Sequence, residues 1–167
     1  YSSVRYGNVT NSRASVVPLW RTQLAAGIPP SLTSLTMSRF WLTLPEAVSH
    51  VWWAAQHAER GSILVPHLPA YNVGDLLRAV TDVAPVVIGV RPGEKVAECL
   101  ATEAELASAR LIRAAPDGRP LYYSIPPVNP SWEAAPHWPY LAETMAQPHA
   151  GTDPYTSDTW PWRLGVP

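Results

Sequence analysis

Hydrophobic residues along the first two-thirds of the chain switch between helical and strand-like spacing. Apolar positions at intervals of three and four predict helices that begin after Ser15, at Pro45 and after Asn72, with one more over 102–109. Short apolar runs predict strands over 4–9, around Leu32, over 62–65 and over 86–90. Strands and helices that alternate in this way are typical of an α/β fold.

The run at 86–90 is the clearest strand in the sequence. It is uninterrupted, partly β-branched, and followed by the turn-forming pair Pro92-Gly93. We expect it to be buried and to deliver Arg91 to a surface turn. At the first helix, Ser15 is expected to act as the N-cap and Gly27 to end the helix.

The character of the sequence changes after residue 115. Residues 116–167 hold more than half of the chain's 19 prolines and half of its 8 tryptophans. Proline disfavours a regular helix, and this many tryptophans argue against a free linker. We therefore expect an α/β part over 1–115 and an extended Pro- and Trp-rich tail over 116–167 that lies across another surface.

Charge and composition exclude several kinds of partner. With a net charge of -1, the chain has no excess of positive charge that would attract nucleic acid or an anionic membrane. No apolar run reaches the length of about 18 residues that a transmembrane helix needs. The single cysteine, Cys99, rules out an intrachain disulfide framework and fits a reducing compartment. We expect a cytoplasmic protein with no integral membrane segment.

The sequence lacks the common catalytic motifs. It contains no GxGxxG dinucleotide fingerprint, no phosphate-binding loop and no nucleophile elbow. The five histidines are scattered, and no metal site is predicted. The chain opens at Tyr1 with a strand and no initiator methionine, which favours a part cut from a longer enzyme. We expect no catalysis by this part alone.

One cluster of polar residues lies between the first strand and the first helix, over 5–18. Asn8 is expected at the end of the strand, and Arg13 in the loop ahead of the helix. Open α/β sheets bind ligands outside the carboxyl ends of their strands. An amide, a guanidinium and a helix N-terminus gathered there suit a sugar that bears a phosphate. A polar loop without a ligand is an equally good interpretation.

A second cluster is IGVRPGEK, over 88–95. Arg91 and Glu94 are spaced so that both can face one cavity, where the arginine would clamp a diphosphate and the carboxylate would accept hydrogen bonds from ribose hydroxyls. Taken alone, an ordinary Arg–Glu pair at the surface is the favoured interpretation. Arg39, within MSRFW, fits a ligand-facing side chain and a buried structural pair equally well.

Taken together in this order, these elements resemble one family closely. RYGNVTNSRASVVP, MSRFWLTLPEAV, RPGEK and YTSDTWPW are similar to segments of the nucleotide-sugar 4,6-dehydratases of polysaccharide biosynthesis. These are extended short-chain dehydrogenase/reductases, and they include the CapD-type proteins and the inverting UDP-N-acetylglucosamine 4,6-dehydratases. The resemblance covers about 1–112 and resumes over 155–162. It departs from the family pattern at Ala14, where glycine is usual, and at Ala97, where histidine is common.

The resemblance implies the carboxyl-terminal part of such an enzyme: the end of a Rossmann sheet with a small substrate-binding subdomain. NADP or NAD would be bound mainly by an amino-terminal half that also carries the Tyr-x-x-x-Lys catalytic pair. The full-length protein would be a lyase that acts on a UDP-sugar and is expected to form a homo-oligomer. A UDP-sugar 4-epimerase of the same superfamily, or a non-catalytic nucleotide-sugar-binding or interaction module, is the alternative.

The resemblance also implies roles for individual residues. Asn8 would hydrogen-bond the nucleotide sugar, and Val9 would pack near the nicotinamide. Arg91 would contact the diphosphate and Glu94 the ribose. Arg39 would give structural support or contact the substrate. The remaining residues expected to line the substrate pocket are Arg13, Val16, Val17, Pro18, Leu19 and Trp20.

Overall fold

The computed structural model describes residues 1–13, 15–113, 120–127, 147–148 and 155–156. The chain divides into two compact units. Unit 1 comprises Tyr1–Tyr6, Ala47–His67 and Cys99–Tyr155, and unit 2 comprises Gly7–Glu46, Leu68–Glu98 and Thr156–Pro167. Ala14, most of the predicted tail and the YTSDTWPW motif beyond Thr156 lie outside the described residues, so the division at 115/116 stays a prediction.

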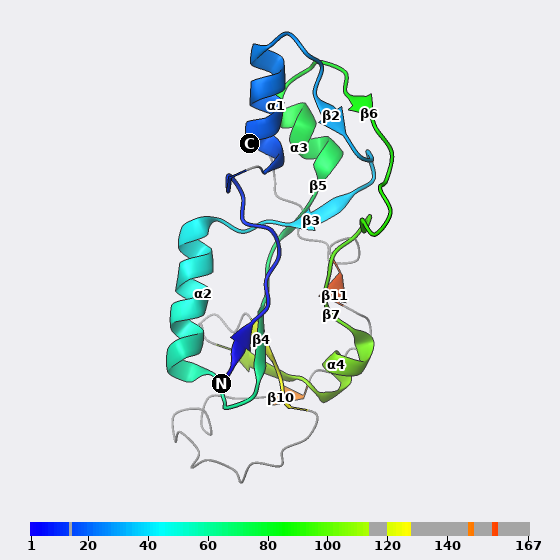
Figure 1. The fold of residues 1–167 in the computed structure, drawn as a ribbon. Coiled ribbons are helices and arrows are strands. Elements are labelled where there is room, and N and C mark those ends of the chain that lie inside the picture. The colour runs from blue at the N-terminus through cyan, green and yellow to red at the C-terminus, as the bar shows by residue number, and fades with distance from the viewer. Residues whose placement is uncertain (14, 114–119, 128–146, 149–154, 157–167) are drawn as a thin grey trace. The chain divides into compact units, whose positions relative to one another are not determined.

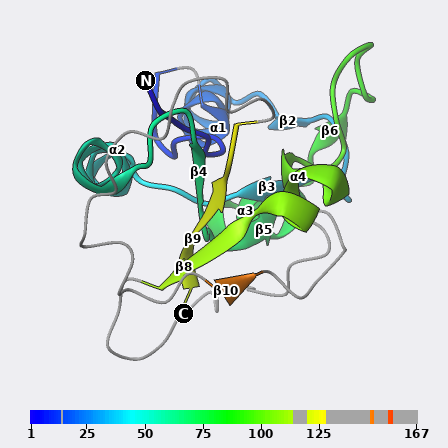
Figure 2. The ribbon, with the colours of Figure 1, turned by 90° about the horizontal axis from the view of Figure 1, so that it is seen from below.

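Unit 1 is built on a five-stranded sheet in the order β1-β4-β9-β8-β10. Four of these strands, β4, β9, β8 and β10, are labelled in Figure 2. Only β1 and β4 are parallel; the other neighbours in the sheet are antiparallel. The strands are β1 (Ser3–Val4), β4 (Ile63–Pro66), β8 (Arg110–Arg113), β9 (Pro120–Ile125) and β10 (Gln147–Pro148). Helix α2 (Leu44–His57) begins where predicted, and its Ala54 packs with Leu64, Ile112 and Tyr122 in one hydrophobic core.

The strand predicted over 4–9 is shorter than expected, because ladder pairing with β4 ends at Val4 and Val9 forms only an isolated bridge to Leu42. By contrast, β9 was not foreseen as part of a sheet. It lies in the Pro-rich region and is nevertheless the middle strand of unit 1. Residues 122–125 of β9 are buried, so this part of the region contributes to the core.

The other predicted helices of the chain are confirmed, and their caps explain where they begin. Helix α3 (Val73–Val80) starts after Asn72, whose side-chain oxygen accepts hydrogen bonds from the amides of Gly74 and Asp75 at 2.8 and 3.1 Å. Helix α4 (Glu103–Ser108) follows β7 (Cys99–Ala101) and starts with a capping box between Thr102 and Glu105. The last described strand is β11 (Tyr155–Thr156).

Unit 2 consists of α1 (Val16–Ala25), α3 and two small sheets (Figure 1). One sheet pairs β2 (Ser31–Leu32) with β6 (Val86–Val87) in parallel, and the other pairs β3 (Ser38–Phe40) with β5 (Ala70–Asn72) in antiparallel. Gly27 follows α1 with φ of 71°, a conformation that glycine adopts without strain. One hydrophobic core cluster of the unit is made of Val17, Trp20, Leu32, Met37, Val73 and Leu77.

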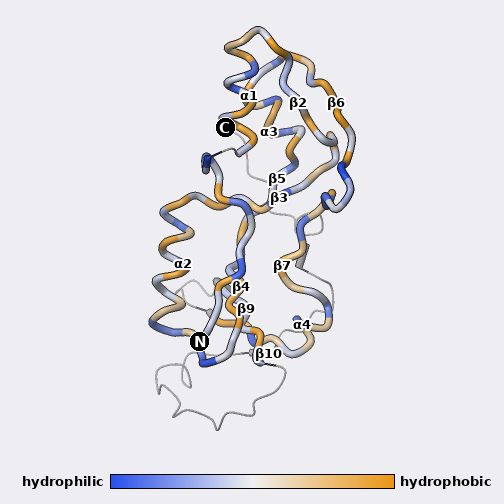
Figure 3. The backbone as a smooth tube through the Cα atoms, viewed as in Figure 1, coloured by the Kyte–Doolittle hydropathy of each residue, from blue (hydrophilic) through white to orange (hydrophobic). Residues whose placement is uncertain are grey.

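The prediction of a buried strand over 86–90 is wrong. The strand comprises Val86 and Val87 alone, and the side chains of Val86, Val87, Ile88 and Val90 are 47–53% exposed. Within the described residues, β6 pairs with β2 and with no other strand, so the apolar run borders a two-stranded sheet. Figure 3 shows this run as an apolar stretch of the tube. An unbroken apolar pattern does not reveal whether a second layer covers it.

Leu32 and Val87 are partners across the β2–β6 pair and give a matched test of this difference in burial. Leu32 is 3% exposed and Val87 is 53% exposed. We predict that Leu32→Ala lowers the free energy of unfolding by about 2–5 kcal/mol, and that Val87→Ala lowers it by less than about 0.5 kcal/mol. Urea denaturation measures both values. Equal losses would show that Val87 is buried in solution.

Candidate functional site

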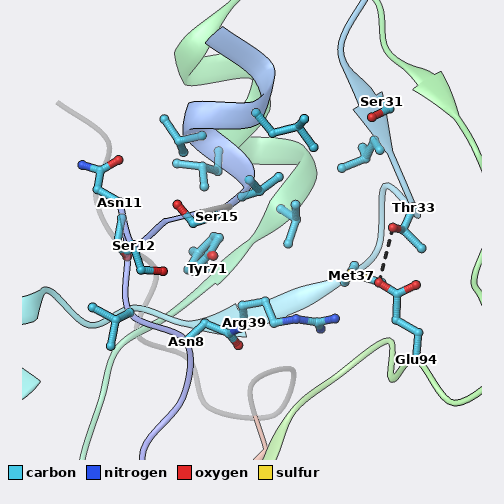
Figure 4. Close-up of a pocket in the computed structure, with 18 of the residues that line it drawn as sticks. Asn8, Asn11, Ser12, Ser15, Ser31, Thr33, Met37, Arg39, Tyr71 and Glu94 are labelled. Atoms are coloured by element: carbon cyan, nitrogen blue, oxygen red, sulfur yellow. Dashed lines mark hydrogen bonds between the residues drawn. The ribbon is translucent and has the colours of Figure 1, made fainter. Parts of the chain in front are cut away.

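A cavity of about 520 Å³ lies in unit 2 (Figure 4). Its volume falls in the range of small-molecule sites. Its wall is formed by the strands β2, β3 and β5, by the start of α1, by α3 and by the loops over 8–13, 33–37 and 88–94. All but two of the residues predicted to touch substrate or cofactor line it: Asn8, Val9, Arg13, Val16, Val17, Leu19, Arg39, Arg91 and Glu94.

The two exceptions, Pro18 and Trp20, do not line the cavity. Trp20 has no exposed surface, and its indole Nε1 donates a hydrogen bond to the Ser31 carbonyl at 2.8 Å. It packs in the core with Val17 and Leu32, which do line the cavity. Trp20 therefore supports the wall from behind.

The segment over 8–13 forms one side of the cavity. Its start is fixed by the bridge between Val9 and Leu42 and by a hydrogen bond from the Thr10 amide to the Leu42 carbonyl at 2.7 Å. Asn11 then adopts φ of 58°, the left-handed region that asparagine tolerates better than most residues. The resulting turn leads the chain to α1 and places both Asn8 and Arg13 on the cavity wall.

The N-terminus of α1 also faces the cavity. Ser15 is the N-cap residue by position, as predicted, but its side chain makes no capping hydrogen bond. Its Oγ atom is buried and has no hydrogen-bond partner within the described part of the chain. First-turn amides of a helix lack partners inside the helix and favour anions, although Pro18 contributes no N–H. This end of the cavity can therefore accept hydrogen-bond acceptors and negative charge.

The turn at Arg91 forms the opposite side. The Glu94 amide donates to the Arg91 carbonyl at 3.0 Å, and Gly93 has φ of 82°. The Glu94 carboxylate accepts hydrogen bonds from the Thr33 hydroxyl and from the Arg91 amide, each at 3.4 Å. Among the described residues, the Arg91 guanidinium makes no ion pair, with Glu94 or with any other carboxylate. Arg91 and Glu94 therefore do not form the surface ion pair that the motif alone favours.

Arg39 holds this turn against β3. Its Nη1 donates to the carbonyls of Ser38 and Val96 at 2.6 and 3.1 Å, and its Nη2 donates to the Lys95 carbonyl at 2.9 Å. Its Nε lies 3.8 Å from the Glu98 carboxylate, and the side chain is only 15% exposed. Through these hydrogen bonds Arg39 supports the 91–96 loop, and its side chain also lines the cavity.

Close packing surrounds Glu98. Burial raises the pKa of its carboxyl group, and the hydrogen bond from the Phe40 amide and the charge of Arg39 oppose that rise. A Cβ atom on Gly7 would lie 2.9 Å from the Phe40 Cβ and 3.0 Å from the Glu98 Oε2. The glycine of the RYGNV motif therefore lets the chain pass β3 closely.

Sequence reasoning missed Thr33 and Tyr71, which also line the cavity. Neither lies in one of the recognised motifs. Tyr71 pairs with Arg39 across the β3–β5 ladder, so only the strand pairing could have revealed it. The described residues include no group of His, Cys, Asp and Glu that could hold a metal ion. None of the helices among them has the length and apolarity to cross a membrane.

Comparison with known proteins gives one family. Residues 1–114 match the profile of the family described as polysaccharide biosynthesis protein. The X-ray structure of Pen from Bacillus thuringiensis superposes with a TM-score of 0.71 at 29% sequence identity, and it covers 95% of this chain and 45% of Pen. The mixed α/β architecture is therefore that of part of Pen.

Curated relatives extend this similarity. A UDP-glucose 4-epimerase of Rickettsia canadensis is 36% identical over 129 residues, which is 72% of this chain and 38% of the relative. An inverting UDP-N-acetylglucosamine 4,6-dehydratase of Campylobacter jejuni is 34% identical over 102 residues, covering 60% and 30%. An uncharacterized membrane protein of Methanocaldococcus jannaschii is 37% identical over 118 residues, covering 64% and 35%. The matches span between 30% and 38% of the length of these relatives.

The role of Arg39 as a loop anchor leads to a hydrogen-exchange prediction. In Arg39→Ala, the carbonyls of Lys95 and Val96 lose their guanidinium donors, so the 91–96 loop opens more readily. We expect the amides of Glu94 and Ser38 to exchange at least about tenfold faster, as expected when hydrogen bonds to a charged group are lost. Native-state hydrogen exchange by NMR measures this.

Arg78→Ala is the control, because it removes an exposed pair with Asp75 and should leave these amides unchanged. Arg39→Lys should restore little protection, since an ammonium lacks the planar fork of donors. Unchanged exchange in Arg39→Ala would mean that backbone contacts alone hold the loop.

Proposed function

The chain belongs to the polysaccharide biosynthesis protein family, and we propose that it forms the substrate-binding portion of a UDP-sugar 4,6-dehydratase. The substrate would resemble UDP-N-acetylglucosamine, and the pathway would be capsule, O-antigen or surface polysaccharide biosynthesis. One observation carries the proposal: a single cavity of unit 2 gathers residues from the RYGNV, MSRF and RPGEK motifs, which lie far apart in the sequence. The similarity to a nucleotide-sugar dehydratase and a nucleotide-sugar epimerase supports it.

The turn at Arg91 is the proposed site for the nucleotide end of the substrate. Because the Arg91 guanidinium makes no ion pair within the described residues, its donors are available to a diphosphate. Glu94 is only half-buried, and its carboxylate accepts a long hydrogen bond, of 3.4 Å, from the Thr33 hydroxyl. Two carboxylate oxygens can accept hydrogen bonds from neighbouring ribose hydroxyls. In this proposal Arg91 binds the diphosphate and Glu94 binds the ribose.

The opposite side is the proposed site for the sugar. Asn8 offers both a donor and an acceptor to sugar hydroxyls. Arg13 and the N-terminus of α1 add positive potential on the same side of the cavity, where they would stabilise the phosphate next to the sugar. In this arrangement the chain binds and orients its substrate, and none of its residues is proposed to transfer a proton.

NADP or NAD is the proposed cofactor. The residues of this chain would form only a small part of its binding site. Val9 lines the cavity beside Asn8, so an apolar side chain is available to pack against a nicotinamide ring. The chemistry that the nicotinamide supplies is the reversible acceptance of a hydride from C4 of the sugar. Binding of the rest of the cofactor is proposed to lie outside this chain. A homo-oligomeric assembly and a cytoplasmic location stay predictions.

A UDP-sugar 4-epimerase is the second candidate, favoured by the 36% identity to a UDP-glucose 4-epimerase. The binding residues described here suit either enzyme, since both hold a UDP-sugar with C4 near the nicotinamide. The two differ in what happens after oxidation at C4. A binding or interaction module without catalysis is the third candidate, and it would leave the sugar unchanged.

The products distinguish these candidates. We expect the full-length protein, meaning the product of the complete gene, to convert UDP-N-acetylglucosamine into a 4-keto-6-deoxy sugar with loss of water. Carbon-13 NMR of the reaction mixture would detect the new methyl group. Inversion at C4 without a methyl signal would indicate the epimerase, and unchanged substrate in the presence of NAD and NADP would contradict both enzymes.

Arg91→Ala in the full-length protein tests the diphosphate site. We predict a loss of UDP-sugar affinity of more than about 1.5 kcal/mol, roughly tenfold, because a charge-assisted contact is removed. Isothermal titration calorimetry measures the change. Arg21→Ala is the matched control, since Arg21 is exposed on α1 and does not line the cavity. If the affinities of the Arg91 variant and the wild type agree, Arg91 is not part of the site.

A further inference from the structure

Tyr71 occupies a fixed position on the cavity wall. It is the middle residue of β5 and pairs directly with Arg39 of β3, so the two side chains lie on the same face of the small sheet. The strand cannot slip in register, because the next residue, Asn72, caps α3 through the amides of Gly74 and Asp75. Both Arg39 and Tyr71 line the cavity.

The ring of Tyr71 packs against an aromatic neighbour. Trp41 meets it edge to face, with ring centroids 5.5 Å apart and planes at 84°. Such pairs stabilise one ring orientation. A side chain that is already ordered loses little conformational entropy when it binds a ligand, so it can contribute most of its hydrogen-bond energy to affinity.

The hydroxyl of Tyr71 is not used by the fold. It makes no hydrogen bond to any residue that the structure describes. Its oxygen atom is not fully buried, so a ligand in the cavity can reach it. Burial raises the pKa of Tyr71, with the charge of Glu98 acting in the same direction and that of Arg39 opposing it. The group is therefore a neutral phenol at physiological pH, able both to donate and to accept one hydrogen bond.

The surroundings of Tyr71 indicate which part of a nucleotide sugar it meets. Figure 4 shows the ring between Ser15 on one side and Asn8 with Arg39 on the other, whereas Glu94 and Thr33 lie across the cavity. A neutral hydroxyl suits the hydroxyl and acetamido groups of a hexose. The phosphates are better matched by arginine.

We propose that Tyr71 is a specificity-determining residue of this cavity, and that its hydroxyl hydrogen-bonds a polar group of the hexose in the bound UDP-sugar. This inference rests on the proposed function, because it presumes a UDP-sugar in the cavity. It adds a contact that none of the sequence motifs contains. It also assigns Tyr71 to discrimination between sugars and leaves recognition of the nucleotide to Arg91 and Glu94.

Tyr71→Phe in the full-length protein tests the proposal, because it removes only the oxygen and keeps the ring against Trp41. Calorimetric titration with UDP-N-acetylglucosamine and with UDP separates the sugar from the nucleotide. We expect Tyr71→Phe to weaken UDP-N-acetylglucosamine binding about three- to tenfold, the size of one hydrogen bond, and to leave UDP binding unchanged. Tyr6→Phe is the matched control, since Tyr6 does not line the cavity.

The outcomes separate this inference from the function on which it rests. If the wild type binds neither UDP nor UDP-N-acetylglucosamine, the proposed function fails and the role of Tyr71 fails with it. If the wild type binds both and Tyr71→Phe binds UDP-N-acetylglucosamine equally well, the role of Tyr71 alone is overturned. An equal loss for UDP and for UDP-N-acetylglucosamine would also overturn it, because the effect would then not concern the sugar.

Discussion

The cavity of unit 2 depends on how one nearly buried guanidinium is satisfied. A charged group removed from water must be paired or hydrogen-bonded, because an unpaired one is strongly destabilising. Arg39 meets this demand with backbone carbonyls of Ser38, Lys95 and Val96 and with the nearby Glu98 carboxylate. The loop that follows β6 is thereby bound to β3. Arg39 therefore lines the cavity and also ties the 91–96 loop, which carries Arg91, to β3.

The polar groups that line the cavity differ in whether they already have hydrogen-bond partners in the protein. The Arg39 guanidinium is engaged with the protein itself, whereas the Glu94 carboxylate accepts hydrogen bonds from Thr33 and Arg91 and keeps further acceptor capacity for a ligand. By contrast, the Arg91 guanidinium, the Ser15 Oγ and the Tyr71 hydroxyl have no hydrogen-bond partner within the described residues, and all three residues line the cavity. Polar groups that converge on a cavity without partners are what a binding site for a polar ligand requires.

Local signals in the sequence were sufficient for much of the fold and of the site. Asn72 and Thr102 mark helix starts through their own side chains, and the motifs around Asn8 and Arg91 indicated the cavity. What failed depended on contacts distant in sequence. The exposure of Val87 follows from the lack of a covering layer in the described structure, and the place of β9 follows from pairing with strands on both sides. Neither is encoded in the apolar pattern itself.

The ligand proposed for the cavity of unit 2 is a UDP-sugar, with its nucleotide end at the Arg91 turn. A crystal structure of the full-length protein with UDP-N-acetylglucosamine tests it most directly. We expect a diphosphate within hydrogen-bond distance of the Arg91 guanidinium, a ribose at the Glu94 carboxylate, and the hexose beside Asn8. Substrate bound outside this cavity, or bound in it with the hexose at Arg91, would rule out the proposed binding mode.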